Sequence, residues 1–528
     1  MKCSNIIQQN YTVKRLRLPL ETDILIDVSD PIYTFDEVLG SVDLKKYLIS
    51  ELKDPRGRIG YNPINLLKVI LFGFMMNGYV SLRELEDLCK TNIRYMWLLR
   101  DEDDYPSHQT FGNFMNLYLK DNVENIFRDI NNYIFTKDNV DLRNLYIDGT
   151  KLEASSNKYT WVWKKACLTS RERLYKKITL TLDSINNELL TLESFRYGLR
   201  EIYEIDYLED LFNDYLNRFK VDISSFVYKQ GKRKTAIQRY YDNLFEYLNK
   251  LKEYATKIEI CGTHRNSYSK TDKDATFMRI KTDYMGNDQL LPAYNYQIGV
   301  SDEYIAVCDV NQYASDQDCF VPLMNKYKEL YNKYPERAIG DAGYGSYNNY
   351  LFCDTNNIGK YMKFTMYKKE TTNEKYREDI FRAVNFKRDI DDDLVCPNNK
   401  KFKFSHTKPV KGNKFERTEE YYKCEDCTGC PLRELCHKQA GNRIVKVNEE
   451  LTSFHEEVIL NLESTKGALL RMNRSIQAEG VFGTIKHNRF YKRIVRKNLD
   501  SVKLEIFMVS IGFNLMKYHN KKQRLICW

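Results

Sequence analysis

No stretch of this 528-residue chain is long and apolar enough to read as a membrane span. A span needs roughly 20 consecutive, mostly apolar residues. The longest candidate, Ile64 to Met76, is shorter and is interrupted by Lys68. The N-terminal stretch also lacks the apolar core and cleavage site of a signal peptide. These absences predict a cytoplasmic protein with no membrane partner.

Histidine is scarce, and its seven positions show no metal-ligand spacing, so no histidine metal site is expected. The 13 cysteines are an odd number, and Cys89, Cys308 and Cys319 stand alone. A disulfide scaffold is not expected in a cytoplasmic chain of this size. Internal repeats and long low-complexity linkers are also missing. The 82 basic and 73 acidic residues leave a net charge of +9, which hints at a polyanionic partner.

The length predicts two to four domains. Residues from about 43 to 135 have helical patterns, and Pro63 suits a first helical turn. Ser81 with Glu84 fits a capping box, and Ser107 fits a further helix start. Short helices in this order suit either a DNA-binding helix-turn-helix domain or a generic helical bundle. Strand patterns then begin near Leu142.

Two short apolar strands run directly into an aspartate. Leu145 to Ile147 precede Asp148, and Ala338 to Gly340 precede Asp341. Asp-Gly is a common turn dipeptide, but the carboxyl ends of strands in open sheets are also where functional sites assemble. We therefore predict a carboxylate site at this sheet edge. Gly149 is expected to let the backbone turn away from Asp148.

Glu479 is the third candidate acid. Its segment is predicted to be helical from about Lys466, with Gly480 as a weak point. Lys486 lies seven residues after Glu479, which places both on one helix face. A carboxylate and a lysine on one face suit a phosphate-facing site, although an exposed charge pair has the same pattern.

The order of these motifs resembles the DDE transposases of bacterial insertion sequences, and more narrowly the branch numbered eleven eighty-two. The resemblance covers most of the chain and is carried by "RIGYNPINLLKVILFGFMMNGYVSLRELE", "YIDGTKLEASSNKYTWVWKK", "TDKDATFM", "AYNYQIGVSD", "IGDAGYGS" and "AEGVFGTIKHNRF". It implies a catalytic triad of Asp148, Asp341 and Glu479, followed by Lys486. Related transposases often carry tyrosine and arginine seven and four residues before the glutamate. Met472 and Ser475 stand there in this chain, with Arg474 one residue away.

The resemblance also implies an α+β or α/β fold with an RNase H-like mixed sheet flanked by helices. We expect four parts, which are a helical N-terminal DNA-binding domain (1–138), a catalytic domain (139–162, 259–365 and 449–522), an inserted long helical hairpin (163–258) and a cysteine-rich insertion (366–448). The hairpin is either a solvated connector or an arm that grips nucleic acid or a second subunit. Its two helices are predicted to flank the charged turn "YKQGKRKT".

Three carboxylates suit phosphodiester chemistry with two Mg²⁺ or Mn²⁺ ions, which prefer oxygen ligands. We expect Asp148 to bridge both ions, Asp341 to hold one and Glu479 the other. Water would then free a 3′-hydroxyl, and that hydroxyl would attack target DNA. Two element ends have to meet, so a homodimer on DNA, at the bacterial nucleoid, is expected.

The cysteine-rich insertion has the pattern C-x2-C-x2-C-x5-C, formed by Cys424, Cys427, Cys430 and Cys436. Close thiolates in a cytoplasmic chain favour a structural Zn²⁺, with Cys396 as an alternative ligand. An iron–sulfur cluster is the rival, and cysteines without any metal are the third alternative. A bound metal of either kind is expected to clamp an insertion poor in strands.

Basic side chains crowd the segment after Glu479 and favour contacts with DNA phosphates, although a solvated basic helix face has the same composition. The DNA-contact candidates are Arg474, Lys486, Arg489, Tyr491, Lys492, Arg493, Arg496 and Lys497. The tyrosine is predicted to stack on a frayed base. Asp272 and Asp274 are expected to be turn or cap groups outside the metal site. Besides an active transposase, a DNA-binding relic without catalysis and a stand-alone metal-dependent nuclease are compatible with these residues.

Overall fold

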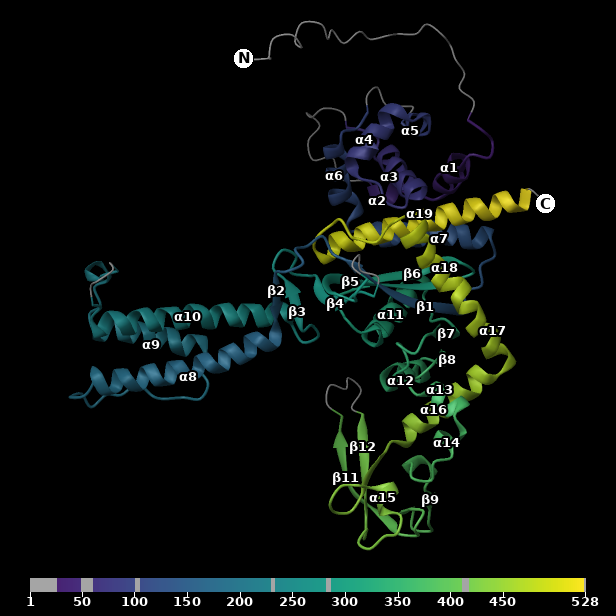
Figure 1. The fold of residues 1–528 in the computed structure, drawn as a ribbon. Coiled ribbons are helices and arrows are strands. Elements are labelled where there is room, and N and C mark those ends of the chain that lie inside the picture. Colours follow the sequence, from purple (N-terminus) through teal and green to yellow (C-terminus); the bar gives the residue numbers. More distant parts are fainter. Residues whose placement is uncertain are drawn as a thin grey trace.

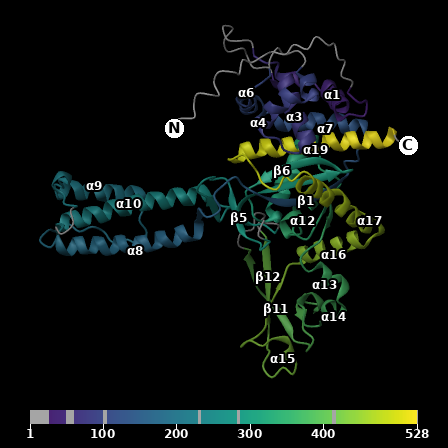
Figure 2. The ribbon, with the colours of Figure 1, turned by 45° about the horizontal axis from the view of Figure 1, so that its top comes forward.

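The computed structural model describes residues 26–48, 60–99, 105–228, 233–281, 286–410 and 417–526. Figure 1 shows three appendages around a central sheet: the N-terminal helices on one side, a small sheet on the opposite side, and a long helical arm that projects sideways. Figure 2 shows the same arrangement after rotation, so the arm stands clear of the body in both views.

The N-terminal part is helical, as predicted. Its helices are α1 (Pro31–Ser41), α2 (Lys45–Leu48), α3 (Pro63–Asn77), α4 (Leu82–Thr91), α5 (Ile93–Leu98), α6 (His108–Phe114) and α7 (Val123–Lys137). Pro63 opens α3, and Ser81 with Glu84 forms the capping box of α4. Ser107 caps α6, because its side chain accepts a hydrogen bond from the Thr110 amide. The predicted helix starts are therefore confirmed.

In the described ranges, no single helix has the length and hydropathy of a membrane span. Only α3 and α4 taken together reach that measure, and the pair is bent by 99°.

The central sheet is six-stranded, and its strands run in the order β4-β5-β1-β7-β8, with β6 beside β5. The strands are β1 (Asn144–Glu153), β4 (Thr276–Arg279), β5 (Leu290–Ser301), β6 (Tyr304–Asn311), β7 (Arg337–Gly340) and β8 (Gly359–Met362). β1, β5 and β6 are joined antiparallel, whereas β7 and β8 are parallel to β1. Helices α11 (Phe320–Tyr331) and α12 (Tyr347–Thr355) precede β7 and β8, as parallel connections require.

β1 does not end at Asp148, which corrects the prediction of a strand end there. The strand continues to Glu153, paired with β5 as far as Ala293. What ends near Asp148 is the parallel neighbour, since β7 pairs with β1 only from Asn144 to Tyr146. Asp148 therefore lies in the middle of β1, just beyond the point where β7 stops pairing with that side of the strand.

Helix α19 (Leu499–Ile526) joins the N-terminal helices to the sheet. It contacts α3, α7 and β6, and one continuous hydrophobic core includes all of them. A Cβ on Gly512 of α19 would lie 2.5 Å from the Phe74 carbonyl oxygen of α3, so the two helices cross in backbone contact. The N-terminal helices and the central sheet thus share a core.

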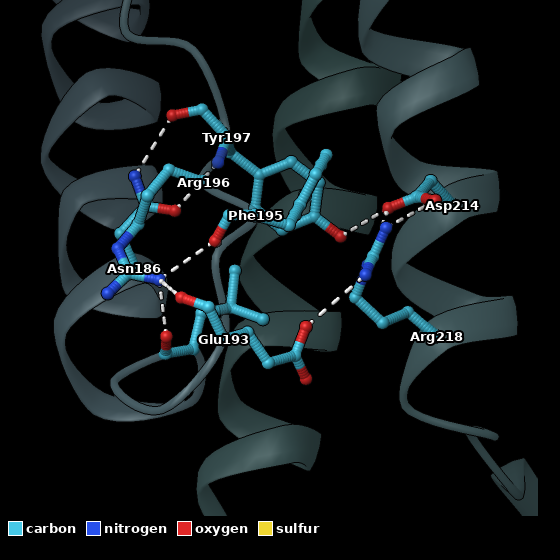
Figure 3. Close-up of polar contacts among 8 residues, drawn as sticks. Asn186, Glu193, Phe195, Arg196, Tyr197, Asp214 and Arg218 are labelled. Carbon is cyan, nitrogen blue, oxygen red and sulfur yellow. Dashed lines mark hydrogen bonds and ion pairs between the residues drawn. The ribbon is translucent and has the colours of Figure 1, made fainter.

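The arm has three helices where two were predicted. They are α8 (Lys164–Glu188), α9 (Ile205–Arg218) and α10 (Ala236–Cys261), packed around a core of their own. Figure 3 shows how the link before α9 is fixed: Asn186 bonds the Tyr197 backbone in both directions, and Tyr197 Oη donates to Asp214 at 2.8 Å. Strands β2 (Trp161–Trp163) and β3 (Ser267–Ser269) pair at the base of the arm.

The cysteine-rich insertion is not poor in strands, and this prediction was wrong. Its five-stranded sheet contains β9 (Lys387–Arg388), β10 (Leu394–Val395), β11 (Lys401–Pro409), β12 (Thr418–Cys424) and β13 (Ile444–Val447). Short helices flank it: α13 (Tyr367–Thr372), α14 (Glu374–Arg377) and α15 (Arg433–Cys436). Helices α16 (Glu449–Glu463), α17 (Thr465–Arg474) and α18 (Gly480–Gly483) then lead back along the central sheet.

Candidate active site

The first two acids stand side by side because of the sheet register. Tyr146 of β1 pairs with Ile339 of β7 in the parallel ladder. Two residues further along each strand, on the same face, come Asp148 and Asp341. Asp341 follows the end of β7, and its Oδ1 accepts a hydrogen bond from the Gly343 amide at 2.8 Å. The predicted meeting of two acids at one sheet edge thus has a structural basis.

Gly149 serves a purpose other than the predicted turn. The side chain of Gln297, on the adjacent β5, is fully buried and crosses over it. A Cβ at position 149 would lie 2.1 Å from Gln297 Nε2. Glycine therefore makes room for a buried polar side chain that itself donates to Asn295 and Asp316.

We expect Gly149→Ala to destabilise the protein by about 2 kcal/mol, because overpacking a rigid core costs about that much. Gly40→Ala is the matched control, since nothing lies within 4 Å of the added Cβ there. Thermal denaturation should show a lower midpoint for the first variant only. Equal midpoints would mean that Gln297 moves aside freely.

Glu479 reaches the same edge from a helix with two π-helical segments. The helix runs through α17, Ser475–Glu479, α18 and Thr484–Asn488, and the second and fourth pieces are π-helical. A π turn contains one extra residue, so the side chain at i+5 takes the place of the one at i+4. Arg474 accordingly stands one turn before Glu479, and its Nη2 lies 2.8 Å from Glu479 Oε1. The one-residue offset of this arginine is compensated by the π turn.

The second π-helical segment, Thr484–Asn488, carries Lys486 to the vicinity of Asp148. Its ammonium donates to Thr150 Oγ1, two residues beyond Asp148 on β1. Burial lowers the pKa of Lys486, while the nearby Asp148 carboxylate opposes that shift and Lys492 adds to it. One acid and one lysine of the predicted set are therefore neighbours.

Burial dominates the electrostatics of Asp148, whose side chain is 20% exposed. The pKa of Asp148 is raised from 3.8 to about 6, mainly by burial, and the charges of Asp341 and Glu479 contribute to this rise. Arg474, at 3.8 Å, and the Gly149 amide act in the opposite direction. Asp341 and Glu479 are thus each close enough to Asp148 to affect its carboxyl.

Across the described residues, no three His, Cys, Asp or Glu side chains lie close enough together to hold a metal ion. At the carboxylates, Arg474 contacts both Asp148 and Glu479, so its charge lies between two of the acids. The oxygen donors fit a hard divalent cation. To hold one, Asp148 and Glu479 would have to exchange their contacts with Arg474 for contacts with the ion.

The cysteines gather from two segments without forming a ligand set. Cys396, Cys424 and Cys427 share the small core of the insertion. Burial raises the pKa of the Cys424 thiol to about 12. Other sulfurs accept hydrogen bonds: Lys400 donates its amide to Cys396 at 3.4 Å, and Arg443 donates to Cys436 at 2.9 Å. Hydrogen bonds of this kind stabilise thiolates. Cysteine thiolates are suitable ligands for Zn²⁺, but in the described residues no three of these sulfurs lie close enough together to bind one ion.

The segment after Asn488 is not a helix, and of its predicted DNA contacts Tyr491 is buried and Arg489 is partly buried. Tyr491 is 3% exposed, stacks on Tyr79 and donates to Glu505 at 2.7 Å, so it presents no ring face to a base. Arg489 packs against Gly78 and donates to the Phe74 carbonyl at 3.3 Å. Burial lowers its pKa to about 10. The stacking role predicted for Tyr491 is therefore corrected, whereas Arg489 is only partly buried and its contact with DNA stays a prediction.

The other basic residues of the segment remain at the surface to different degrees. Lys492, Arg493 and Lys497 are exposed. Arg493 lies 3.6 Å from Glu153 at the end of β1. Arg496 is partly buried, because its guanidinium reaches Asn116 and Met115.

Asp272 and Asp274 are structural, as expected. Tyr294 donates to Asp272 at 2.9 Å. Asp274 accepts from the Leu499 amide at 2.9 Å and so caps the start of α19.

Sequence reasoning missed two cations at this edge, Lys363 and Arg471. Lys363 directly follows β8, as Asp341 follows β7. A search of the strand ends for basic as well as acidic residues would have identified Lys363. Arg471 lies three residues before Arg474 on α17, hence on the same helix face.

Comparison with known families gives two matches. Residues 20–117 match a family described as Transposase domain (DUF772), and residues 395–519 match one described as Transposase DDE domain. The second match includes Glu479 and Lys486, whereas Asp148 and Asp341 lie outside both. No curated protein and no solved structure matches the chain. The two family matches, one toward each end of the chain, identify it as a DDE transposase of an insertion sequence.

Proposed function

We propose that this transposase binds the terminal inverted repeats of its element, cuts the DNA there and joins the freed 3′ ends to target DNA. The observation that carries the proposal is the meeting of Asp148, Asp341 and Glu479 at one sheet edge, with Lys486 beside them. We also propose that the central sheet is RNase H-like. Its three antiparallel strands followed by two parallel ones support this assignment.

The three carboxylates are the proposed ligands of two Mg²⁺ or Mn²⁺ ions. When bound, such ions would supply electrostatic stabilisation for the charge that develops on the reacting phosphate. Glu479, with a 54% exposed side chain, can turn toward Asp148 once it leaves Arg474. Lys486 is fixed by Thr150 and offers an ammonium to a DNA phosphate next to the acids.

Exposed basic residues extend the proposed DNA surface from this edge. Lys492, Arg493 and Lys497 lie beyond Lys486 on the segment that returns along β1. Because two element ends have to be joined together, we propose a homodimer on DNA. Its place of action would be the cytoplasm, at the nucleoid.

The proposal is tested with labelled element-end DNA, a target plasmid and Mg²⁺, comparing the wild-type protein with Asp148→Asn. We expect the wild type to cut and join, and the variant to bind only. Cut but unjoined ends under all conditions would favour a stand-alone nuclease. Binding without any cutting, with Mn²⁺ also supplied, would favour a DNA-binding relic.

We further propose that the cysteines of the insertion hold one structural Zn²⁺, with ligands chosen from Cys396, Cys424, Cys427, Cys430 and Cys436. The purified protein should then contain about one zinc per chain by mass spectrometry, and Cys427→Ser should lose it. Cys319→Ser is the control, since that thiol is buried in the main body. Absorbance near 400 nm with iron present would instead indicate an iron–sulfur cluster.

A further inference from the structure

Three neighbouring strands, β1, β7 and β8, lead to Asp148, Asp341 and a lysine, Lys363, at the same edge of the sheet. In the parallel ladder of β7 and β8, Gly340 pairs with Met362. The next residues along the two strands are Asp341 and Lys363, so the register orders the edge as Asp148, Asp341, Lys363. Burial lowers the pKa of Lys363, and so do the nearby charges of Arg471 and Arg474, whereas Asp341 opposes the shift. Three cations therefore converge on the flank of the carboxylates.

Among the described residues, two of these three cations form no ion pair. Arg474 is paired with Asp148 and Glu479. In the described parts of the chain, neither Lys363 nor Arg471 has an ion pair within 4 Å. The Nε of Arg471 is also buried without any hydrogen-bond partner. Leaving a buried donor and two adjacent like charges unpaired is costly, and an anion bound between them would remove the cost.

The backbone holds this arrangement tightly. A Cβ on Gly345 would lie 2.0 Å from the carbonyl oxygen of Lys363. The loop that carries Asp341 thus packs directly on the backbone of Lys363, and any side chain at position 345 would push them apart. The lysine and the acid are held as one unit.

We propose that Lys363, Arg471 and Arg474 form an anion subsite that holds a phosphodiester of the DNA strand engaged by the carboxylates. This inference rests on the proposed function and adds the group that positions the strand. An arginine guanidinium offers two parallel donors to a phosphate, and a lysine offers a compact charge. Holding a phosphate beside three acids needs such cations, because carboxylates alone would repel it.

The test measures DNA binding separately from cutting. A fluorescein-labelled 30-base-pair duplex of mixed sequence is titrated by anisotropy, with Ca²⁺ in place of Mg²⁺, over a range of salt concentrations. Each lost phosphate contact lowers the slope of log affinity against log salt by about 0.9. We expect Lys363→Met with Arg471→Met to lower the slope by about 2 and to weaken binding at least about tenfold at low salt.

Lys466→Ala is the matched control, since Lys466 is exposed on the same helix and lies five residues, roughly 140° around the helix, before Arg471. It should leave slope and affinity unchanged. If the double variant does not fold, Lys363→Met alone should lower the slope by about 1. An unchanged slope in the folded variants would overturn the subsite even if the wild type cuts and joins DNA. A lower slope in a protein that never cuts would keep the subsite and remove the proposed function.

Discussion

Replacing any one of the three acids by its amide should lower DNA cutting by about 10³-fold or more, which corresponds to a barrier about 4 kcal/mol higher. Asp148→Asn, Asp341→Asn and Glu479→Gln each remove one negative oxygen from the site while preserving shape. The charges of Asp341 and Glu479 both act on the Asp148 carboxyl, which supports the proposal of one shared site. The loss should be of similar size for all three and should not add up in a triple variant.

Asp318→Asn is the control for this series. Asp318 is exposed in a short 3-10 turn, Asp316–Cys319, of the same domain. Its replacement should leave the rate of cutting within about twofold of wild type, because a surface charge away from a site contributes little. A loss confined to one acid, with the other two variants active, would contradict a shared site. Retained DNA binding in all variants separates lost chemistry from lost folding.

The buried Asp148 carboxyl should make the stability of the protein depend on pH. The folded chain holds the proton of Asp148 up to about pH 6, whereas the unfolded chain releases it near 3.8. The folded state therefore binds more protons between these values, and its stability falls as the pH rises through that window. Two pKa units correspond to about 3 kcal/mol. Above pH 6, wild type carries this cost, and Asp148→Asn does not.

We therefore expect Asp148→Asn to unfold several degrees above wild type at pH 8 without divalent metal, and close to wild type at pH 4. Thermal denaturation in chelator measures both. Asp318→Asn should show no such difference, because its carboxylate is exposed. Equal midpoints of wild type and Asp148→Asn at pH 8 would mean that Arg474 and the Gly149 amide fully offset burial. A gain in stability on losing an active-site charge is typical of sites that exist for function.

The elements that the sequence predicts well are those with strong local signals. The caps at Ser81 and Ser107 and the proline at Pro63 mark helix starts by chemistry that neighbours do not alter. The approach of Asp148 to Asp341 follows from apolar strands that lead into acids. Burial patterns and caps suffice for such features because each depends on a few adjacent residues.

Features that depend on distant partners could not be predicted. β1 continues past Asp148 because β5 pairs with it, although Thr150, Lys151 and Glu153 are typical of a turn or surface. β11 is almost wholly exposed, so it lacks the alternation of burial that marks a strand, and β12 supplies its hydrogen bonds. The burial of Tyr491 depends on Tyr79 and Glu505, which are far away in sequence or on another element.

Other features had signals that were not used. Helix α9 carries Leu208, Leu211, Phe212 and Tyr215 at helical spacing, all buried in the arm. The π turn before Glu479 is different, since its extra residue only becomes visible as the offset of Arg474. Arg474 contacts Glu479 although it stands five residues before it instead of four. The spacing of the arginine and the glutamate can therefore grow by one residue when a π turn takes up the extra residue.

Asp148, Asp341 and Glu479 are proposed to bind the metal ions of a DNA-cutting site. Asp341→Cys tests this proposal most directly, because Asp341 is exposed and tolerates replacement, and a thiolate is a poor ligand for Mg²⁺ but a better one for softer ions. Cutting of element-end DNA is measured with Mg²⁺ and with Mn²⁺. We predict that the variant is inactive with Mg²⁺ and recovers part of its activity with Mn²⁺, whereas Asp341→Ala recovers none. Full activity of Asp341→Cys with Mg²⁺ would contradict a role of Asp341 as a metal ligand.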